Sequence, residues 1–292
     1  MPSTRDIRRR IKSVKNTAQI TKAMQMVAAS KMRRAQQAAL SGRPYATLMN
    51  QVLAQVTEKL SDFSHPLTEK REGRKKAVIL VSTDKGLCGA LNTNLLREAA
   101  KDDQENTIFI TAGRKGSQYI ARTGRQLAGE FNYSDTPVFA EARTISKFAQ
   151  KLFLDEEVDQ VEVLFTNFVS TLTQHPDRRT ILPVGEITAV ESDVSGENKP
   201  EELDIESVEY LFEPGADQVL GALLPHYLNY IVYQLLLETK ASEHSARMVA
   251  MKSATDNAQS MIKDLTLEYN KIRQANITSE LLEITGAAMA MG

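Results

Sequence analysis

The stretch MKSATDNAQSMIKDLTLEYNKIRQA, residues 251–275, decides the fold. Apolar side chains recur in it every seven residues and a second set lies between them, which is the pattern of two packed helices. The first set is Met251, Ala258, Leu265 and Ile272, and the second is Ala254, Met261 and Ala275, with Glu268 as the exception. The pattern predicts a helix from about Pro214 to Thr285 that packs along a narrow apolar stripe.

A second helical pattern occupies residues 4–60. Ser3 and Asp6 have the spacing of a capping box at its start, and Gly42 and Pro44 predict a kink. One face carries small and apolar residues at spacings of three and four, namely Ile7, Ile11, Val14, Ala18, Thr21, Ala28, Met32, Ala35 and Ala39, with Gln25 in the gap. This face predicts a partner helix.

The two predicted helices are too long to bury their stripes against a small domain. At ~1.5 Å per residue they would extend roughly 85 Å and 105 Å. We therefore expect them to pack against each other, antiparallel because the chain leaves along one and returns along the other. Paired positions should then sum to about 275, which sets Met24 beside Met251 and Val14 beside Met261. Pro225 is expected to bend or break the base of the second helix.

Between the helices the hydrophobic pattern changes to short apolar runs. Residues 77–82, 107–111 and 161–165 have the composition of buried strands, and helical patterns at 91–101, 115–122 and 145–154 separate them. Residues 181–190 could add a strand. The predicted fold class is α+β, a long antiparallel two-helix coiled coil formed by the N- and C-terminal segments with a central small Rossmann-like α/β domain. The predicted parts are 1–60, 75–208 and 211–292.

Charge is balanced overall but unevenly distributed. The net charge is −1, whereas residues 1–43 hold eleven basic side chains and one acidic one, a local charge of +10 that should seek an acidic partner. Residues 191–213 hold nine carboxylates and predict an exposed loop. The single cysteine, Cys88, excludes an internal disulfide. The most apolar stretch, 219–237, is too polar for a membrane span, and Met1 is expected to lie close to the mature start.

Two short motifs are candidates for binding sites. STDKGLCG, residues 82–89, follows a strand and precedes a helix, where an α/β fold would hold a phosphate, but it matches neither GxxxxGK[ST] nor GxGxxG. A structural turn or a partner contact is favoured over nucleotide binding. GRKG, residues 113–116, resembles the clamp of a KH domain, but the chain has no Trp and no aromatic residue before Tyr45. RNA binding is therefore the weaker alternative.

The sequence gives no positive sign of an active site. The four histidines are far apart and none forms a metal-ligand pair with Cys88: His65, His175, His226 and His244. No GxSxG nucleophile elbow is present. We predict no catalytic residue, no cofactor and no metal, although a free-standing α/β enzyme and a nucleic-acid-binding coiled coil remain the rival classes.

Both ends of the predicted helix pair are unusually apolar. AMQMVAASKM, residues 23–32, is apolar around most of its circumference, which is typical of a helix surrounded by other protein. The last residues, ITGAAMAMG at 284–292, are also apolar. A frayed terminus is one interpretation of this tail, and a tip seated inside another protein is the other.

Four blocks of sequence resemble the gamma subunit of F-type ATP synthases. They are ITKAMQMVAASKM at 20–32, STDKGLCG at 82–89, ASEHSARMVAMK at 241–252 and YNKIRQANIT at 269–278. The resemblance implies a non-catalytic rotor shaft that stands inside a ring of alternating alpha and beta subunits. Its α/β foot would rest on the c-subunit ring of the membrane sector and bind an epsilon-type subunit. The shaft would couple proton flow to ATP synthesis or hydrolysis on the beta subunits.

The resemblance also implies which residues touch partners. Contacts with the catalytic ring are expected at Met24, Arg247, Arg273, Gln274 and Thr278, and contacts of the foot with the rotor and the epsilon-type subunit at Lys85, Gly86 and Leu87. Met24 alone could equally be a residue of the helix stripe. No nucleic acid and no nucleotide is expected to bind. The location implied is peripheral, on the cytoplasmic face of the bacterial inner membrane, or on the matrix face if the protein is organellar. The chain lacks the paired-cysteine insert of chloroplast members, and the acidic stretch 191–213 matches no family contact.

Overall fold

The computed structural model describes residues 3–42, 44–46, 48–49, 52–53, 65–71, 73–184 and 215–291. The chain forms two compact units, one of Met1–Ala28 with Met248–Gly292 and one of Ala29–Arg247. Helices α1 (Thr4–Ser41) and α6 (Ala216–Met291) each contribute to both units. The predicted part boundaries at 60 and at 208–211 lie outside the described residues, as do the acidic stretch 191–213 and residues 185–190, so the three-part division stays a prediction.

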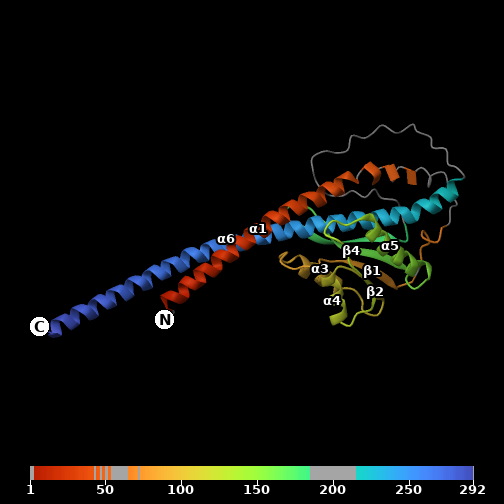
Figure 1. The fold of residues 1–292 in the computed structure, drawn as a ribbon. Helices are drawn as coiled ribbons and strands as arrows, with labels where there is room; N and C mark the ends of the chain where they lie inside the picture. The colour runs from red at the N-terminus through yellow and green to blue at the C-terminus, as the bar shows by residue number, and fades with distance from the viewer. Residues whose placement is uncertain are drawn as a thin grey trace. The chain divides into compact units, whose positions relative to one another are not determined.

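The first unit is an antiparallel helix pair, as predicted. In it the start of α1 runs beside α6 (Figure 1). The Thr21 and Thr255 hydroxyls are hydrogen bonded at 2.8 Å, and Arg8 donates to the Tyr269 hydroxyl at 2.8 Å. These pairs sum to 276 and 277, within two residues of the expected register. The predicted stripe of α1 is confirmed, because its members in this unit are buried or half-buried: Ile7, Ile11, Val14, Ala18, Thr21, Gln25 and Ala28.

The second stripe of α6 differs from the prediction by one residue. Met251 and Ala258 are buried, but Met261 is 53% exposed. The stripe instead passes through Thr255, which is buried, and then through Ile262 and Tyr269, which are half-buried. Apolarity alone favoured Ala254 and Met261, whereas Thr255 and Tyr269 can be enclosed because their hydroxyls are hydrogen bonded to α1. The two hydrogen-bonded pairs set Val14 level with residues 262–263, next to the expected Met261, and the pairing of Val14 with Met261 itself stays a prediction.

The second unit is built on a five-stranded sheet in the order β3-β2-β1-β4-β5. The first four of these strands are parallel, and β5 is antiparallel to β4. The strands are β1 (Lys76–Val81), β2 (Thr107–Ala112), β3 (Leu127–Phe131), β4 (Gln160–Phe168) and β5 (Gln174–Leu182). The helices between them are α3 (Leu91–Ala99), α4 (Arg114–Arg122) and α5 (Phe139–Leu154). This mostly parallel sheet confirms the predicted central α/β domain.

Helices cover both faces of this sheet (Figure 1). One face of the sheet packs against α5 and the 216–247 part of α6, through Ile79, Val163, Phe153, Leu228 and Leu235. The other face packs against α3 and α4, through Val78, Leu80, Leu164, Leu95 and Ile120. Neighbouring residues of β1 therefore serve opposite faces, and burial on both sides explains why these strands have continuous apolar runs.

Two expected interruptions in the long helices have different outcomes. The chain continues as one helix through Pro225, so proline does not end α6, which also extends past the predicted Thr285 to Met291. At the other interruption α1 ends at Ser41, and helical residues resume at Pro44. The carbonyl of Gly42 there accepts a hydrogen bond of 2.7 Å from the Tyr230 hydroxyl. A Cβ at this glycine would lie 2.9 Å from the hydroxyl oxygen of Tyr230.

Candidate functional site

The 82–89 loop is hydrogen bonded to the start of α4, the helix that follows β2. The first three N–H groups of α4 donate to it: Arg114 to Asp84 Oδ1 at 3.0 Å, Lys115 to the Thr83 carbonyl at 3.0 Å and Gly116 to Ser82 Oγ at 2.7 Å. These are the donors that a helix N-terminus offers to an anion. Because the loop already satisfies them, these donors of α4 are not open to an anion, and the loop serves as a structural turn that fixes the start of α4.

The GRKG segment is part of the same packing. Gly113 has φ 101°, and a Cβ on it would lie 2.2 Å from the Ser82 carbonyl oxygen. A Cβ on Gly116 would lie 2.9 Å from Ser82 Oγ. Both glycines thus allow α4 to approach the end of β1, which accounts for their presence without a nucleic acid. In the described ranges, no three His, Cys, Asp or Glu side chains are grouped to hold a metal ion.

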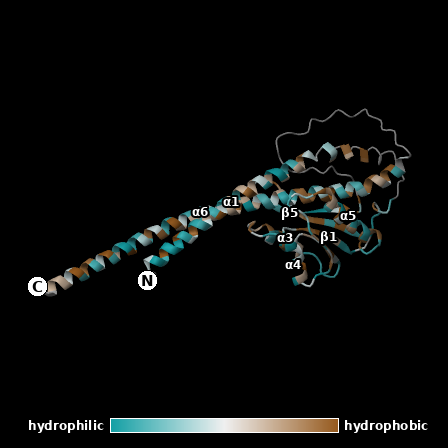
Figure 2. Cartoon of the chain, viewed as in Figure 1, coloured by the Kyte–Doolittle hydropathy of each residue, from teal (hydrophilic) through white to brown (hydrophobic). Residues whose placement is uncertain are grey.

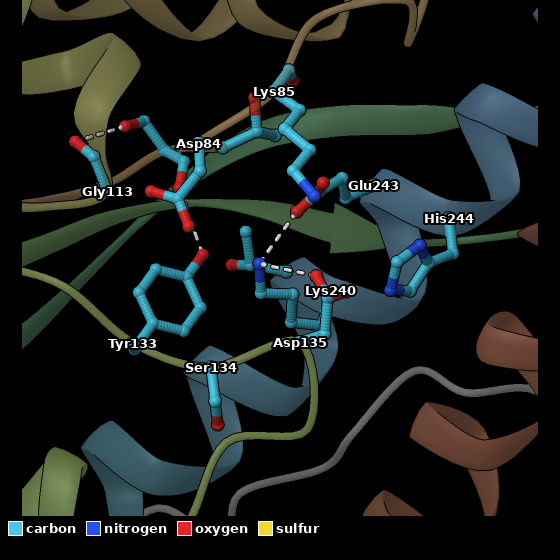
Figure 3. Close-up of polar contacts among 12 residues, drawn as sticks. Asp84, Lys85, Gly113, Tyr133, Ser134, Asp135, Lys240, Glu243 and His244 are labelled. Atoms are coloured by element: carbon cyan, nitrogen blue, oxygen red, sulfur yellow. Dashed lines mark hydrogen bonds and ion pairs between the residues drawn. The ribbon is translucent and has the colours of Figure 1, made fainter.

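The second unit contains a line of five charged side chains of alternating sign, which we call the charge chain: Lys31, Asp135, Lys240, Glu243 and Arg247. Lys31 donates to Asp135 Oδ2, and Asp135 Oδ1 lies 3.9 Å from Lys240 Nζ. Lys240 Nζ donates to Glu243 Oε2 at 3.0 Å, and Arg247 Nη2 donates to Glu243 Oε1 at 2.7 Å. Figure 3 shows Lys240 between the two carboxylates.

The centre of the charge chain is shielded from water. The side chains of Lys240 and Glu243 are 1% and 3% exposed, and the ammonium of Lys240 lies 4.4 Å from the centre of the Tyr133 ring. Burial raises the pKa of Tyr133 well above its usual value, and its hydroxyl donates to the Ser82 carbonyl at 2.9 Å. At the exposed end, the hydrogen bond from Lys31 lowers the pKa of Asp135.

Arg247 connects the charge chain to the 82–89 loop. Its guanidinium donates to the carbonyl oxygens of Gly86 at 3.2 Å and Lys85 at 3.4 Å. Leu87, the next residue, has φ 63° and is 62% exposed. The following residue, Cys88, is buried, and burial raises the pKa of its thiol.

Four of the predicted contact residues lie together in the second unit, and the other four belong to the first unit. Arg247 holds the loop of Lys85, Gly86 and Leu87 within the second unit. The other predicted contacts, Met24, Arg273, Gln274 and Thr278, belong to the first unit, where Met24 is half-buried and the others are exposed. The contacts themselves stay predictions.

Most of the charge chain cannot be predicted from the sequence. The spacing of Lys240, Glu243 and Arg247, three and then four residues apart, was a readable signal of paired side chains on one helix. No sequence signal connects them with Asp135, which meets α6 only in the fold, or with Lys31, which pairs with Asp135.

The first unit exposes many large apolar side chains. On α1 these are Ile20, Met26 and Val27, at 60%, 60% and 55% exposure. On α6 they are Leu267, Ile277, Leu281, Leu282, Ile284 and Met289. Figure 2 shows hydrophobic colouring recurring along α6 towards its C-terminal end. Apolar surface on this scale is typical of a protein interface.

Comparison with known proteins gives a consistent result. A family model described as ATP synthase matches residues 3–291. The chain is 52% identical to the ATP synthase gamma chain of Opitutus terrae over 99% of both chains, and 47% identical to that of Methylacidiphilum infernorum over the full length of both. Its fold resembles the rotor of the Euglena gracilis mitochondrial ATP synthase, with a TM-score of 0.65, 19% identity and coverage of 94% and 98%. A chain of the central stalk and c-ring structure of the Tetrahymena thermophila mitochondrial ATP synthase matches with a TM-score of 0.60 and 23% identity. The match covers 80% of this chain and 99% of that chain.

Proposed function

The chain belongs to the family of ATP synthase gamma chains, and on that premise we propose how its parts carry out the shaft function of that family. It is a rotor shaft that has no catalytic site of its own, since the nucleotide chemistry takes place on the beta subunits. In the proposed mechanism, the first unit turns inside the ring of alternating alpha and beta subunits. The second unit rests on the c ring and binds the epsilon-type subunit.

The observation that carries this proposal is the exposed apolar surface of a helix pair that is already packed on its inner face. Met26 and Val27 point away from the stripe and are more than half exposed. Each such side chain would contribute about 1.5–3 kcal/mol if fully buried by a partner. Apolar contacts have no preferred direction, so a surrounding collar can hold the helices and still let them turn.

We propose that polar contacts add the asymmetry that rotation requires. Arg273, Gln274 and Thr278 follow one another along an exposed stretch of α6, and Met24 lies on the opposite helix of the pair. These four residues, with Arg247, are the proposed contacts with the catalytic ring. Lys85, Gly86 and Leu87 are the proposed contacts of the foot with the rotor and the epsilon-type subunit.

Work is transferred because the shaft contacts the conformations of the beta subunits unequally. A ligand shifts a conformational equilibrium only by its difference in affinity for the two states. For a beta subunit, the face of the shaft presented to it acts as that ligand. Proton flow turns the c ring and the foot, and the three beta subunits then meet successive faces of the shaft.

The proposed location is peripheral, on the cytoplasmic face of a bacterial inner membrane, or on the matrix face if the chain is organellar. The bacterial relatives support the first of these. No helix in the described ranges is long and apolar enough to cross a membrane. Membrane contact is therefore assigned to the partner c ring.

Reconstitution with alpha and beta subunits tests the proposal. A probe is attached to Leu172→Cys, a position 79% exposed, in a Cys88→Ser background, with the alpha and beta subunits immobilised. We expect increased ATP hydrolysis and rotation of the probe in one direction. The chain without partners should hydrolyse nothing. Hydrolysis by the chain alone would favour the enzyme interpretation, and an assembled complex in which the probe never turns would refute the shaft function.

A further inference from the structure

We propose that the charge chain is a latch that fixes the α/β domain to the two long helices and transmits torque between them. The inference rests on the proposed shaft function and adds a positioning role for Lys240, a residue to which no partner contact is assigned. Lys31 lies on α1, Asp135 between β3 and α5, and Lys240 on α6. Each element that torque must pass through in the second unit thus contributes a charge.

The links of the charge chain around Asp135 join different elements, and the remaining ion pairs lie along α6. Asp135 lies between two ammonium groups, one on each long helix, with Lys31 on one side and Lys240 on the other. Glu243 then pairs with Lys240 and Arg247 along α6, and Arg247 reaches the loop that follows β1. The sheet is therefore held at two loops, 132–138 and 82–87, and both are fixed to the same surface of α6.

Apolar packing could not by itself prevent α6 from rotating against the sheet. The face of the sheet towards α6 is covered by side chains such as Leu228 and Leu235, whose contacts depend on buried area and hardly on direction. Hydrogen bonds between charged groups are directional and lose strength quickly as the geometry changes. Rolling α6 against the sheet would separate Lys240 from Asp135 and would withdraw Arg247 from the carbonyl oxygens of the 82–87 loop. Lys240 and Glu243 would keep each other, because both lie on α6, but a buried cation would lose its second carboxylate, which is unfavourable. The charge chain therefore opposes the motion that the apolar contacts permit.

Buried ion pairs are a poor choice for stability alone, because well-packed apolar residues often serve equally well. Here the ion pairs fix the position of α6 relative to the loops of the sheet. The chain ends on the carbonyl oxygens of Lys85 and Gly86, directly before the exposed Leu87. The Thr83 hydroxyl holds the same loop by donating to the Lys85 carbonyl at 2.7 Å. A proposed partner contact is thus connected rigidly to the helix that must turn with it.

Lys240→Met tests the latch, because it removes the central cation while leaving Lys31 with Asp135 and Arg247 with Glu243. The complex with alpha and beta subunits is observed with the probe at Leu172→Cys, and the angular fluctuation is recorded while the motor waits for ATP. We expect at least about a twofold increase in angular variance, since the ion pair that joins α6 to the loop between β3 and α5 is lost. ATP hydrolysis without load should stay at the wild-type rate, and proton pumping per ATP in the complete synthase should fall.

Matched variants separate the latch from a merely structural role. Lys263→Met removes an exposed lysine of α6 and should leave the stiffness unchanged. Lys240→Arg keeps the cation and should show the stiffness of the wild type. If Lys240→Met does not assemble, Asp135→Asn, at a side chain 45% exposed, should loosen the same connection.

The possible failures are distinguishable. If the shaft function is wrong, the wild-type probe does not rotate. If only the latch is wrong, the wild type rotates, and Lys240→Met or Asp135→Asn rotates with wild-type stiffness and pumping. A lower melting temperature with normal stiffness would also overturn the latch, since it would show that Lys240 contributes only to stability.

Discussion

His244 should make the second unit sensitive to acid. Its side chain is 2% exposed, and Arg247 Nη1 lies 3.3 Å from Nδ1. A guanidinium can only donate, so Nδ1 accepts and the neutral ring carries its proton on Nε2. Among the described residues, Nε2 has no hydrogen-bond partner. Burial lowers the pKa of His244 from 6.5 to about 4, with Arg247 and Lys240 acting in the same direction and Glu243 and Asp135 opposing them.

The sign and size of the effect follow from this shift. The folded chain keeps the ring neutral, whereas the unfolded chain protonates it below its ordinary pKa of 6.5. The contribution to stability is therefore complete above that pKa and is lost as the pH falls towards the folded value of about 4. At about pH 5 the loss from this residue amounts to about 2 kcal/mol.

The substitution His244→Gln isolates this contribution. Glutamine keeps an acceptor for Arg247 but does not titrate. The free energy of unfolding of the full chain in urea is measured at about pH 7.5 and about pH 5 for both proteins. Other titrating groups are shared and cancel in the comparison. The wild type should lose about 2 kcal/mol more than the variant. An equal loss in both would refute the reasoning that the buried ring stays neutral.

Three further outcomes are expected. Gly113→Ala should destabilise the second unit by about 3 kcal/mol in urea unfolding, because a Cβ would lie 2.2 Å from the Ser82 carbonyl; an unchanged midpoint would contradict the packing of α4. Ile7→Ala should cost about 2–5 kcal/mol in the first unit, where Ile7 is 1% exposed, and should speed hydrogen exchange at the start of α1; unchanged exchange rates would argue against the pair. Met26→Ser with Val27→Ser should leave the stability of the isolated chain within about 0.5 kcal/mol but weaken binding to alpha and beta subunits about tenfold. Equal affinity would contradict the proposal that apolar contacts hold the helix pair inside the ring.

The sequence was sufficient to predict the helix pair because its signal repeats over many turns. The stripe of α1 could be read from Ile7 to Ala39, since small residues that recur at spacings of three and four are typical of a packed helix face. The second stripe of α6 was misread because Thr255 and Tyr269 are counted as polar. Their burial depends on hydroxyl partners from α1, which a single helix does not reveal.

The edge strands of the sheet and the charge chain were also hard to predict from the sequence, because both depend on neighbours that only the fold supplies. Strands β1, β2 and β4 are covered on both faces, and their sequences are therefore recognisable as apolar runs. Strands β3 and β5 lie at the edges of the sheet, and their sequences are LAGEF and QHPDRRTIL. An edge strand needs few apolar residues, so its pattern is weak. Likewise, charges on α6 resemble solvated helix pairs until the fold brings Asp135 beside Lys240.

The most direct test of the account is a covalent bond between the two long helices. Thr21→Cys and Thr255→Cys, whose native hydroxyl oxygens are 2.8 Å apart, are introduced in a Cys88→Ser background and oxidised within the complex with alpha and beta subunits. We expect that a disulfide forms and that the linked shaft still rotates during ATP hydrolysis, because the paired helices turn as one. A disulfide that forms only in the control with Lys22→Cys in place of Thr21→Cys, or a rotation that stops on oxidation and returns on reduction, would contradict it.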